Sequence, residues 1–355
     1  MSQTYKSDCK HFRGDVPCKP HKITGIHCVE CSEFFPQNQR ILIIKLGAIG
    51  DVIRTTPLLH KLWREFPSAS IWWLTNSPEI LPSRIDKILP FNLESITTLN
   101  AIEFDIVINF DKDLHACSLA SNLKTKKIIG FTLSDGKPAP ANPESEQKFL
   151  TGLWDDVNKA NDKSYVDEIF EICGFEFKGE EYILEMDDSY SWELPARNKM
   201  YVGLNTGCGS RWTSRLWKFE YWEQLINLLI SKGYTPILLG GEQEHEKNKL
   251  LSEKTGSFYP GYFDLKKFIS LINHCDTVVT AVTMGLHIAI GLKKNVVLFN
   301  NIFNPKEFEL YGRGVILEPE LECKCFFKPQ CTNIEYFCLD HLLPENVMKA
   351  IEQIE

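Results

Sequence analysis

One carboxylate, Asp51, directly follows a glycine-containing turn at residues 45–50. The apolar run before the turn, residues 41–44, predicts a strand buried on both faces. Open α/β sheets bind ligands at the carboxyl ends of their strands, so this turn would place Asp51 in a cleft as a general base. The turn reads G-x-x-G and its lysine precedes the glycines, so it matches neither a dinucleotide fingerprint nor a P-loop. A simple connecting turn with a solvated aspartate is the alternative.

Three loops in the second half of the chain carry residue types that suit a bound diphosphate. Glycines let a phosphate approach backbone N–H groups, cationic side chains neutralise it, and a carboxylate beyond a glycine turn can hold a ribose. Connecting turns without a ligand, and a hydrogen-bonded core histidine, are the alternatives. The candidate donor-site residues are Gly207, Gly209, Ser210, Arg211, Arg215 and Lys218 in the first loop, Gly240, Gly241 and Glu244 in the second, and Thr283, Met284, Gly285 and His287 in the third.

Eight of the 12 cysteines fall into two groups of four, one near each end of the chain. In a reducing compartment, clustered cysteines bind metal more often than they form disulfides. Four thiolates suit tetrahedral Zn²⁺, with iron as the competitor, and a closed four-ligand site is structural. Reduced free thiols are the alternative, and His11 or His21 could replace one thiolate of the first group. The two predicted sets are Cys9, Cys18, Cys28 and Cys31, and Cys323, Cys325, Cys331 and Cys338.

Alternating strand and helix patterns indicate an α/β fold with two Rossmann-like parallel sheets. We predict strands at 41–44, 70–75, 104–109 and 127–131, then at 201–205, 235–239, 276–280 and 295–299. Helices are expected from Pro57 and at 114–123, 164–173, 219–231, 242–254, 264–273, 284–290 and 345–354, and residues 132–163 read as a long loop. The predicted organisation is a Cys-rich segment at 1–38, a domain at 39–185, a linker at 186–200, a domain at 201–320 and a Cys-rich tail at 321–355. Two such domains would face each other across a cleft, where ligands commonly bind.

Length, charge and hydropathy exclude some classes of protein and indicate where the protein is located. A formal charge of −8 over 355 residues argues against a general nucleic-acid binder. No apolar run approaches the roughly 20 residues of a membrane span. The polar N-terminus has no signal-peptide core, so a cytoplasmic location is expected.

Four segments resemble glycosyltransferase family 9, the ADP-heptose heptosyltransferases of bacterial lipopolysaccharide synthesis. They are I-L-I-I-K-L-G-A-I-G-D-V-I-R-T-T-P-L-L, R-W-T-S-R-L-W, L-L-G-G-E-Q-E and T-M-G-L-H-I-A-I-G-L, within residues 40–303. The resemblance implies a GT-B architecture, with the ADP-heptose donor in the C-terminal domain and the acceptor in the N-terminal one. It also implies inverting transfer without a catalytic metal, with Asp51 as general base and Arg215 neutralising the donor diphosphate. Several members carry lysine at the latter position.

The third loop departs from the family pattern D-[ST]-G-x-x-H, because Val282 replaces the aspartate. This segment and the clustered cysteines after it are more similar to the autotransporter heptosyltransferases, which modify protein serines. The acceptor therefore stays open between a lipid-linked glycan and a protein, as do peripheral membrane contact and a homo-oligomer. A sugar-nucleotide epimerase or a binding protein of GT-B architecture is the rival class. A transferase differs from these in consuming its donor only when acceptor is supplied.

Overall fold

The computed structural model describes residues 4–355, which build two α/β units, each around one sheet. The first sheet has the strand order β3-β2-β1-β4-β5-β6 and is parallel except that β6 runs antiparallel to β5. Its strands are β1 Gln39–Ile44, β2 Ala69–Thr75, β3 Lys87–Pro90, β4 Glu103–Asn109, β5 Lys124–Ser134 and β6 Lys137–Pro140. The side chains of residues 41–44 on β1 are fully buried, as expected for a central strand covered on both faces.

The helices of the first unit follow its strands. They are α2 Ile49–Ile53, α3 Leu58–Glu65, α4 Leu93–Asn100, α5 Leu114–Asn122, α6 Glu146–Leu150, α7 Asp155–Ala160 and α8 Tyr165–Ile172. Helix α3 buries Leu58, Leu59 and Leu62 against the sheet. Helix α2 was not predicted: it carries Asp51 in its first turn, so the carboxylate is held by a helix and not by an irregular turn.

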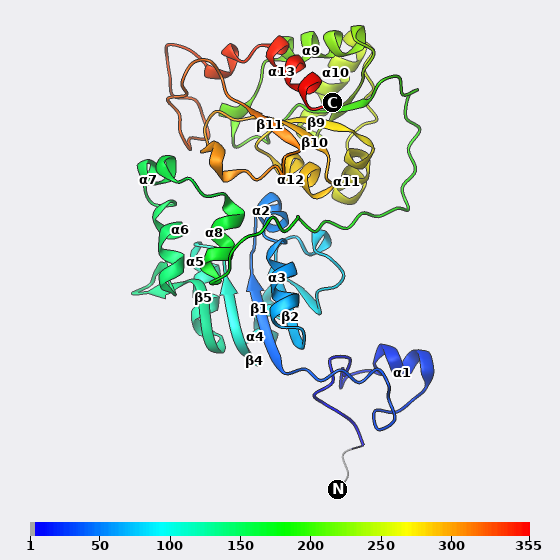
Figure 1. The fold of residues 1–355 in the computed structure, drawn as a ribbon, viewed down its shortest axis with the longest axis vertical. Helices are drawn as coiled ribbons and strands as arrows, with labels where there is room; N and C mark the ends of the chain where they lie inside the picture. Colours follow the sequence, from blue (N-terminus) through cyan, green and yellow to red (C-terminus); the bar gives the residue numbers. More distant parts are fainter. Residues whose placement is uncertain (1–3) are drawn as a thin grey trace.

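The second sheet is fully parallel, with the strand order β11-β10-β9-β7-β8. Its strands are β7 Tyr201–Asn205, β8 Thr235–Leu239, β9 Thr277–Ala281, β10 Asn295–Phe299 and β11 Gly314–Leu317. The helices are α9 Phe219–Ser231, α10 His245–Thr255, α11 Leu265–His274, α12 Met284–Gly291 and the C-terminal α13 Pro344–Gln353. Figure 1 shows that the chain passes from the first unit to the second once, through an extended stretch after α8, and that α13 returns to α9.

The prediction of a long loop at residues 132–163 is wrong. The segment contains the end of β5, then β6, α6 and α7. Pro138 and Pro140 read as loop residues, but β6 lies at the edge of the sheet, where proline is tolerated because the missing N–H faces outward.

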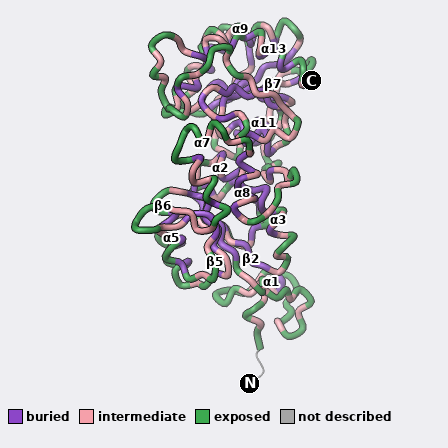
Figure 2. The backbone as a smooth tube through the Cα atoms, turned by 60° about the vertical axis from the view of Figure 1, so that its left-hand side comes forward, coloured by how far each residue is buried: buried purple, intermediate pink, exposed green. Residues whose placement is uncertain are grey.

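The two units meet at α2 and α12, which lie against each other (Figure 1). Buried residues run through both sheets and this junction, whereas residues 4–38 are mostly exposed or half-buried (Figure 2). Those residues contain the short helix α1 Lys19–Thr24 and project from the first unit on the side away from the second. Among the described residues 4–355, no helix has the length and apolar character needed to cross a membrane.

Candidate active site

A cavity of about 680 Å³ lies between the two units and receives side chains from both. Asp51 and Arg54 enter it from α2, while the loops after β7, β8 and β9 enter from the second unit. Most of the predicted site residues therefore meet in one place. Those that line the cavity are Asp51, Gly207, Gly209, Arg215, Gly240, Gly241, Glu244, Thr283, Met284, Gly285 and His287.

The Asp51 carboxylate is held between two cations. Its Oδ1 lies 2.8 Å from Arg54 Nη2, its Oδ2 lies 3.9 Å from Lys45 Nζ, and the Ala48 N–H donates to Oδ2 at 3.3 Å. Its side chain keeps 33% of its surface exposed, so one face of the carboxylate remains open to the cavity. Burial raises the pKa of Asp51, but attraction to Arg54 and Lys45 outweighs burial and lowers the pKa to about 2.

This low pKa gives a pH prediction. A carboxyl group with a pKa of about 2 is roughly 99% ionised at pH 4, so Asp51 should stay deprotonated across the working range of the protein. We therefore expect the pH profile of kcat to show no acid limb near pH 4. An acid limb near pH 4 that shifts in Asp51→Glu would contradict this, because it would mean that Asp51 titrates near its ordinary pKa.

Lys45 fixes the turn that presents Asp51. Its buried ammonium donates to the Gly47 carbonyl at 2.8 Å and pairs with the Asp111 carboxylate, which also accepts from the Leu46 N–H. Burial lowers the pKa of Lys45, but its acidic surroundings, including Asp111 and Asp51, outweigh burial. The net effect raises the pKa above its ordinary value and keeps the side chain charged. The pair joins the carboxyl ends of β1 and β4, so the turn before α2 is rigidly placed.

Sequence reasoning missed Arg54, which links the two units. Its guanidinium donates 2.8 Å bonds to Asp51 and to Glu307 of the second unit, and it stacks over the Tyr165 ring with 3.7 Å to the centroid. The signal was present, since Asp51 and Arg54 stand three residues apart and so share one helix face. Glu307 had no such signal, because only the fold brings it to α2.

Arg215 is a buried cation with unused hydrogen-bonding capacity. Its side chain donates 3.3 Å from Nη2 to the Cys208 carbonyl, and its Nε has no partner among the described residues. The rings of Trp212 and Phe303 lie 5.3 and 5.6 Å from the guanidinium carbon. Burial lowers the pKa of Arg215, but arginine stays protonated. A desolvated guanidinium facing a cavity suits an anionic ligand.

Three predicted donor-loop residues do not line the cavity. Ser210 and Arg211 are exposed at the tip of the loop, and Arg211 lies beside the Trp212 ring. Lys218 forms a 2.8 Å ion pair with Asp340. Arg215 is therefore the cation of this loop that reaches the site.

His287 contributes to the contact between α12 and the first unit. It is buried, stacks on Tyr182 with 6.2 Å between ring centroids, and its Nδ1 has no partner among residues 4–355. Burial and the nearby Arg54 lower the pKa of His287 to about 3, so the ring is neutral. The imidazole packs so closely on Gly50 that a Cβ at that position would overlap it.

We therefore expect Gly50→Ala to push α2 away from α12 and to separate Asp51 from the opposite loops. The predicted result is a drop in kcat of about tenfold or more, because small misplacements of catalytic groups are costly. A double-mutant cycle with His287→Ala checks the cause, since removing the ring should restore part of the rate. Additive losses in the cycle would contradict the steric explanation.

The two cysteine groups differ in geometry. In the C-terminal group, the Sγ atoms of Cys325 and Cys331 lie 3.5 Å apart. In the N-terminal group, Cys18, Cys28 and Cys31 line one cavity but Cys9 does not. Across residues 4–355, no three potential ligands stand close enough to hold an ion in this structure.

The chain was compared with protein-family models and with curated proteins. A family model described as glycosyltransferase family 9 (heptosyltransferase) matches residues 93–336, more than half of the chain. A search of curated proteins found no match.

Several solved structures are similar to this chain. A family 9 glycosyltransferase from Veillonella parvula is 18% identical, with a TM-score of 0.70, and the match covers 90% of this chain and 97% of that one. E. coli heptosyltransferase WaaC with ADP-2-deoxy-2-fluoro heptose is 16% identical, with a TM-score of 0.61 and coverage of 89% and 100%. TibC, an iron-containing dodecameric glycosyltransferase from enterotoxigenic E. coli, is 14% identical, with a TM-score of 0.53 and coverage of 90% and 76%.

These structures confirm the predicted two-unit GT-B architecture. The family match confirms the resemblance seen in the sequence. The chain belongs to glycosyltransferase family 9, the heptosyltransferase family.

Proposed function

We propose that this glycosyltransferase moves a heptose from ADP-heptose to an acceptor hydroxyl, with inversion, in the synthesis of a bacterial cell-surface glycan. The observation that carries the proposal is that Asp51 and Arg215, from opposite units, line one cavity. An acid–base group and an anion-binding group on facing walls are what a sugar-nucleotide transferase requires. The similar WaaC structure, which holds an ADP-heptose analogue, supports this choice of donor.

In the proposed reaction, Asp51 accepts the proton of the acceptor hydroxyl while that oxygen bonds to the anomeric carbon. The bond between this carbon and the diphosphate oxygen breaks, and ADP leaves with the electron pair. A carboxylate of low pKa is a weak base, so proton transfer would follow the start of C–O bond formation, which makes the hydroxyl more acidic. No proposed step uses a metal, because Arg215 would offset the charge that develops on the diphosphate.

The loops of the second unit would hold the donor. Gly207 and Gly240 lie so close to Glu244 that a side chain at either position would overlap it. Glycine at these positions therefore lets the Glu244 side chain lie directly against the loops that follow β7 and β8. The Glu244 carboxylate accepts from the Gly241 N–H at 3.0 Å and could also accept from a ribose hydroxyl. Thr283 and Gly285 would meet a phosphate at the start of α12, where backbone N–H groups point outward.

The test is donor consumption by the purified chain. Release of ADP from ADP-heptose only in the presence of an acceptor supports the transferase. Conversion of the donor to an isomer without acceptor supports the epimerase, and tight binding without either reaction supports a binding protein. Parallel assays with a lipid-linked core glycan and with a serine-containing autotransporter fragment would separate the glycan acceptor from the protein alternative.

The C-terminal cysteines would hold a structural Zn²⁺ or iron ion next to the donor loop. The Ser214 Oγ donates to the Lys328 carbonyl at 2.7 Å, and the Asn301 side chain donates to both Ser214 and Cys338. Loss of the ion from Cys323→Ser/Cys325→Ser should therefore also weaken ADP binding. Unchanged metal content in that variant would remove these residues as ligands.

A further inference from the structure

We infer that residues 4–38 form a separate metal centre whose ligands are Cys18, His21, Cys28 and Cys31. This centre is independent of the proposed transferase function. It also differs from the set of four cysteines predicted from the sequence, because a histidine takes the place of Cys9. Three thiolates and one imidazole form a common tetrahedral ligand set for Zn²⁺, and Fe²⁺ is the alternative.

The fold of the segment turns these four residues toward one another. Cys18 is the N-cap of α1, and His21 follows three residues later in the first turn of that helix. Gly25, with φ of 72°, ends the helix in the left-handed conformation and reverses the chain. Cys28 and Cys31 follow with the C-x2-C spacing, so the segment contains one C-x2-H pair and one C-x2-C pair.

All four side chains line one cavity of about 780 Å³. Among the described residues, no three of these side chains are within binding range of one ion, so metal binding would draw them together inside this space. Cys9 is not part of the cavity wall: it pairs with Pro36 in an isolated β-bridge.

His21 is oriented as metal-binding histidines usually are. Its Nδ1 lies 3.0 Å from the Ile26 carbonyl oxygen. A carbonyl only accepts hydrogen bonds, so Nδ1 carries the hydrogen and Nε2 keeps its lone pair. A backbone carbonyl that fixes the tautomer in this way is the usual outer partner of a metal-bound imidazole. His27 also lines the cavity, at 5.5 Å from His21 between ring centroids, and provides a matched control.

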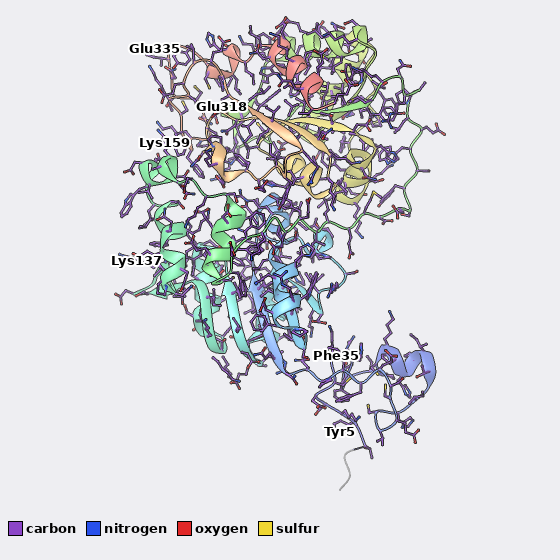
Figure 3. The ribbon with its side chains drawn as sticks, viewed as in Figure 1. Tyr5, Phe35, Lys137, Lys159, Glu318 and Glu335 are labelled. Atoms are coloured by element: carbon purple, nitrogen blue, oxygen red, sulfur yellow. The ribbon has the colours of Figure 1, made fainter. Side chains whose placement is uncertain are left out.

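Burial alone does not account for the order of this segment. Pro20 is its one buried residue among positions 4–38, while Ile23 and Val29 are 72% and 66% exposed. Ion pairing adds a single link to the sheet, from Lys10 to Asp86 at 2.7 Å. Metal binding supplies folding free energy to small segments that lack a core. Tyr5 and Phe35, labelled in Figure 3, mark how far the segment lies from the junction of the two units, so the ion would be structural.

The experiment is metal analysis of the full chain and its variants after purification with Zn²⁺ supplied. Cys28→Ser/Cys31→Ser and His21→Ala should each bind one equivalent less than the parent, whereas Cys9→Ser and His27→Ala should bind the same amount. Reconstitution with Co²⁺ should give intense thiolate-to-cobalt absorption that is lost in the first two variants. A far-UV circular dichroism spectrum close to that of the parent would show that the rest of each variant is folded.

The inference is overturned if Cys28→Ser/Cys31→Ser keeps the full metal content. It is also overturned if Cys9→Ser loses an equivalent while His21→Ala keeps it, since that result assigns the site to four cysteines. Loss in His27→Ala with retention in His21→Ala would likewise refute the ligand set. None of these results depends on whether the transferase proposal holds, because the readout is bound metal.

Discussion

Asp51→Asn is expected to lower kcat by about 10²-fold or more while leaving ADP binding unchanged. The amide has nearly the shape of the carboxylate and can still accept from Arg54, but it cannot take a proton from the acceptor. The proposed donor contacts lie on the opposite wall of the cavity, so they should persist. Steady-state kinetics with saturating acceptor, together with calorimetric titration of ADP, measures the two effects separately.

Asp113→Asn is the matched control. Asp113 also follows a strand of the first sheet, but it caps α5 by accepting from the His115 and Ala116 N–H groups. Asparagine caps helices about as well as aspartate, so this variant should keep both stability and rate. Near-parental turnover of Asp51→Asn would exclude Asp51 as the base.

Arg215→Ala is expected to weaken ADP binding by roughly 10- to 100-fold, because hydrogen bonds to charged groups contribute about 1.5–3 kcal/mol. The transfer rate should fall as well, since charge on the diphosphate grows in the transition state. Arg215→Lys should recover part of the binding, because lysine supplies the charge without the planar pair of donors. The measurements are the Kd of ADP and kcat at saturating donor.

Arg211→Ala provides the comparison for a cation of the same loop. Arg211 is exposed and does not line the cavity, so its loss should change ADP affinity little. An unchanged Kd in Arg215→Ala, with a loss in Arg211→Ala, would reverse the assignment and require the loop to rearrange when it binds ADP.

The central strands and their helices could be predicted because apolar runs and 3.6-residue periods are local properties. The elements that were missed carry weak local signals. Strand β3 has the four residues K-I-L-P at a sheet edge, and helix α4 contains two adjacent threonines, which have low helix propensity. Strand β6 has two prolines, so only its pairing with β5 identifies it.

The lining of the cavity was predictable where a loop follows a buried strand, as with Asp51 and Arg215. Lys218 looked equivalent to Arg215 in the sequence, yet Asp340, far along the chain, engages its charge. No sequence pattern singled out Glu307, because its role depends on its position opposite Arg54 in the folded protein. Pairings between distant residues depend on how the units pack, which one sequence without its fold does not reveal.

The single passage of the chain between the units bears on engineering by domain exchange. A junction within residues 186–200 would move the whole second unit as one block, with no second cut. The difficulty lies in the charges that the two halves share. Glu307 would move with the second unit, while its partner Arg54 would stay with the first. In the same way, Arg313 would move and Glu181 would stay, although the two form a pair with two hydrogen bonds of 2.8 and 2.7 Å. A hybrid that keeps one member of the more buried pair, Arg54 and Glu307, would strand a charge away from water at a cost of roughly 3–5 kcal/mol. Successful hybrids should therefore be those that carry an arginine and a glutamate at these two positions.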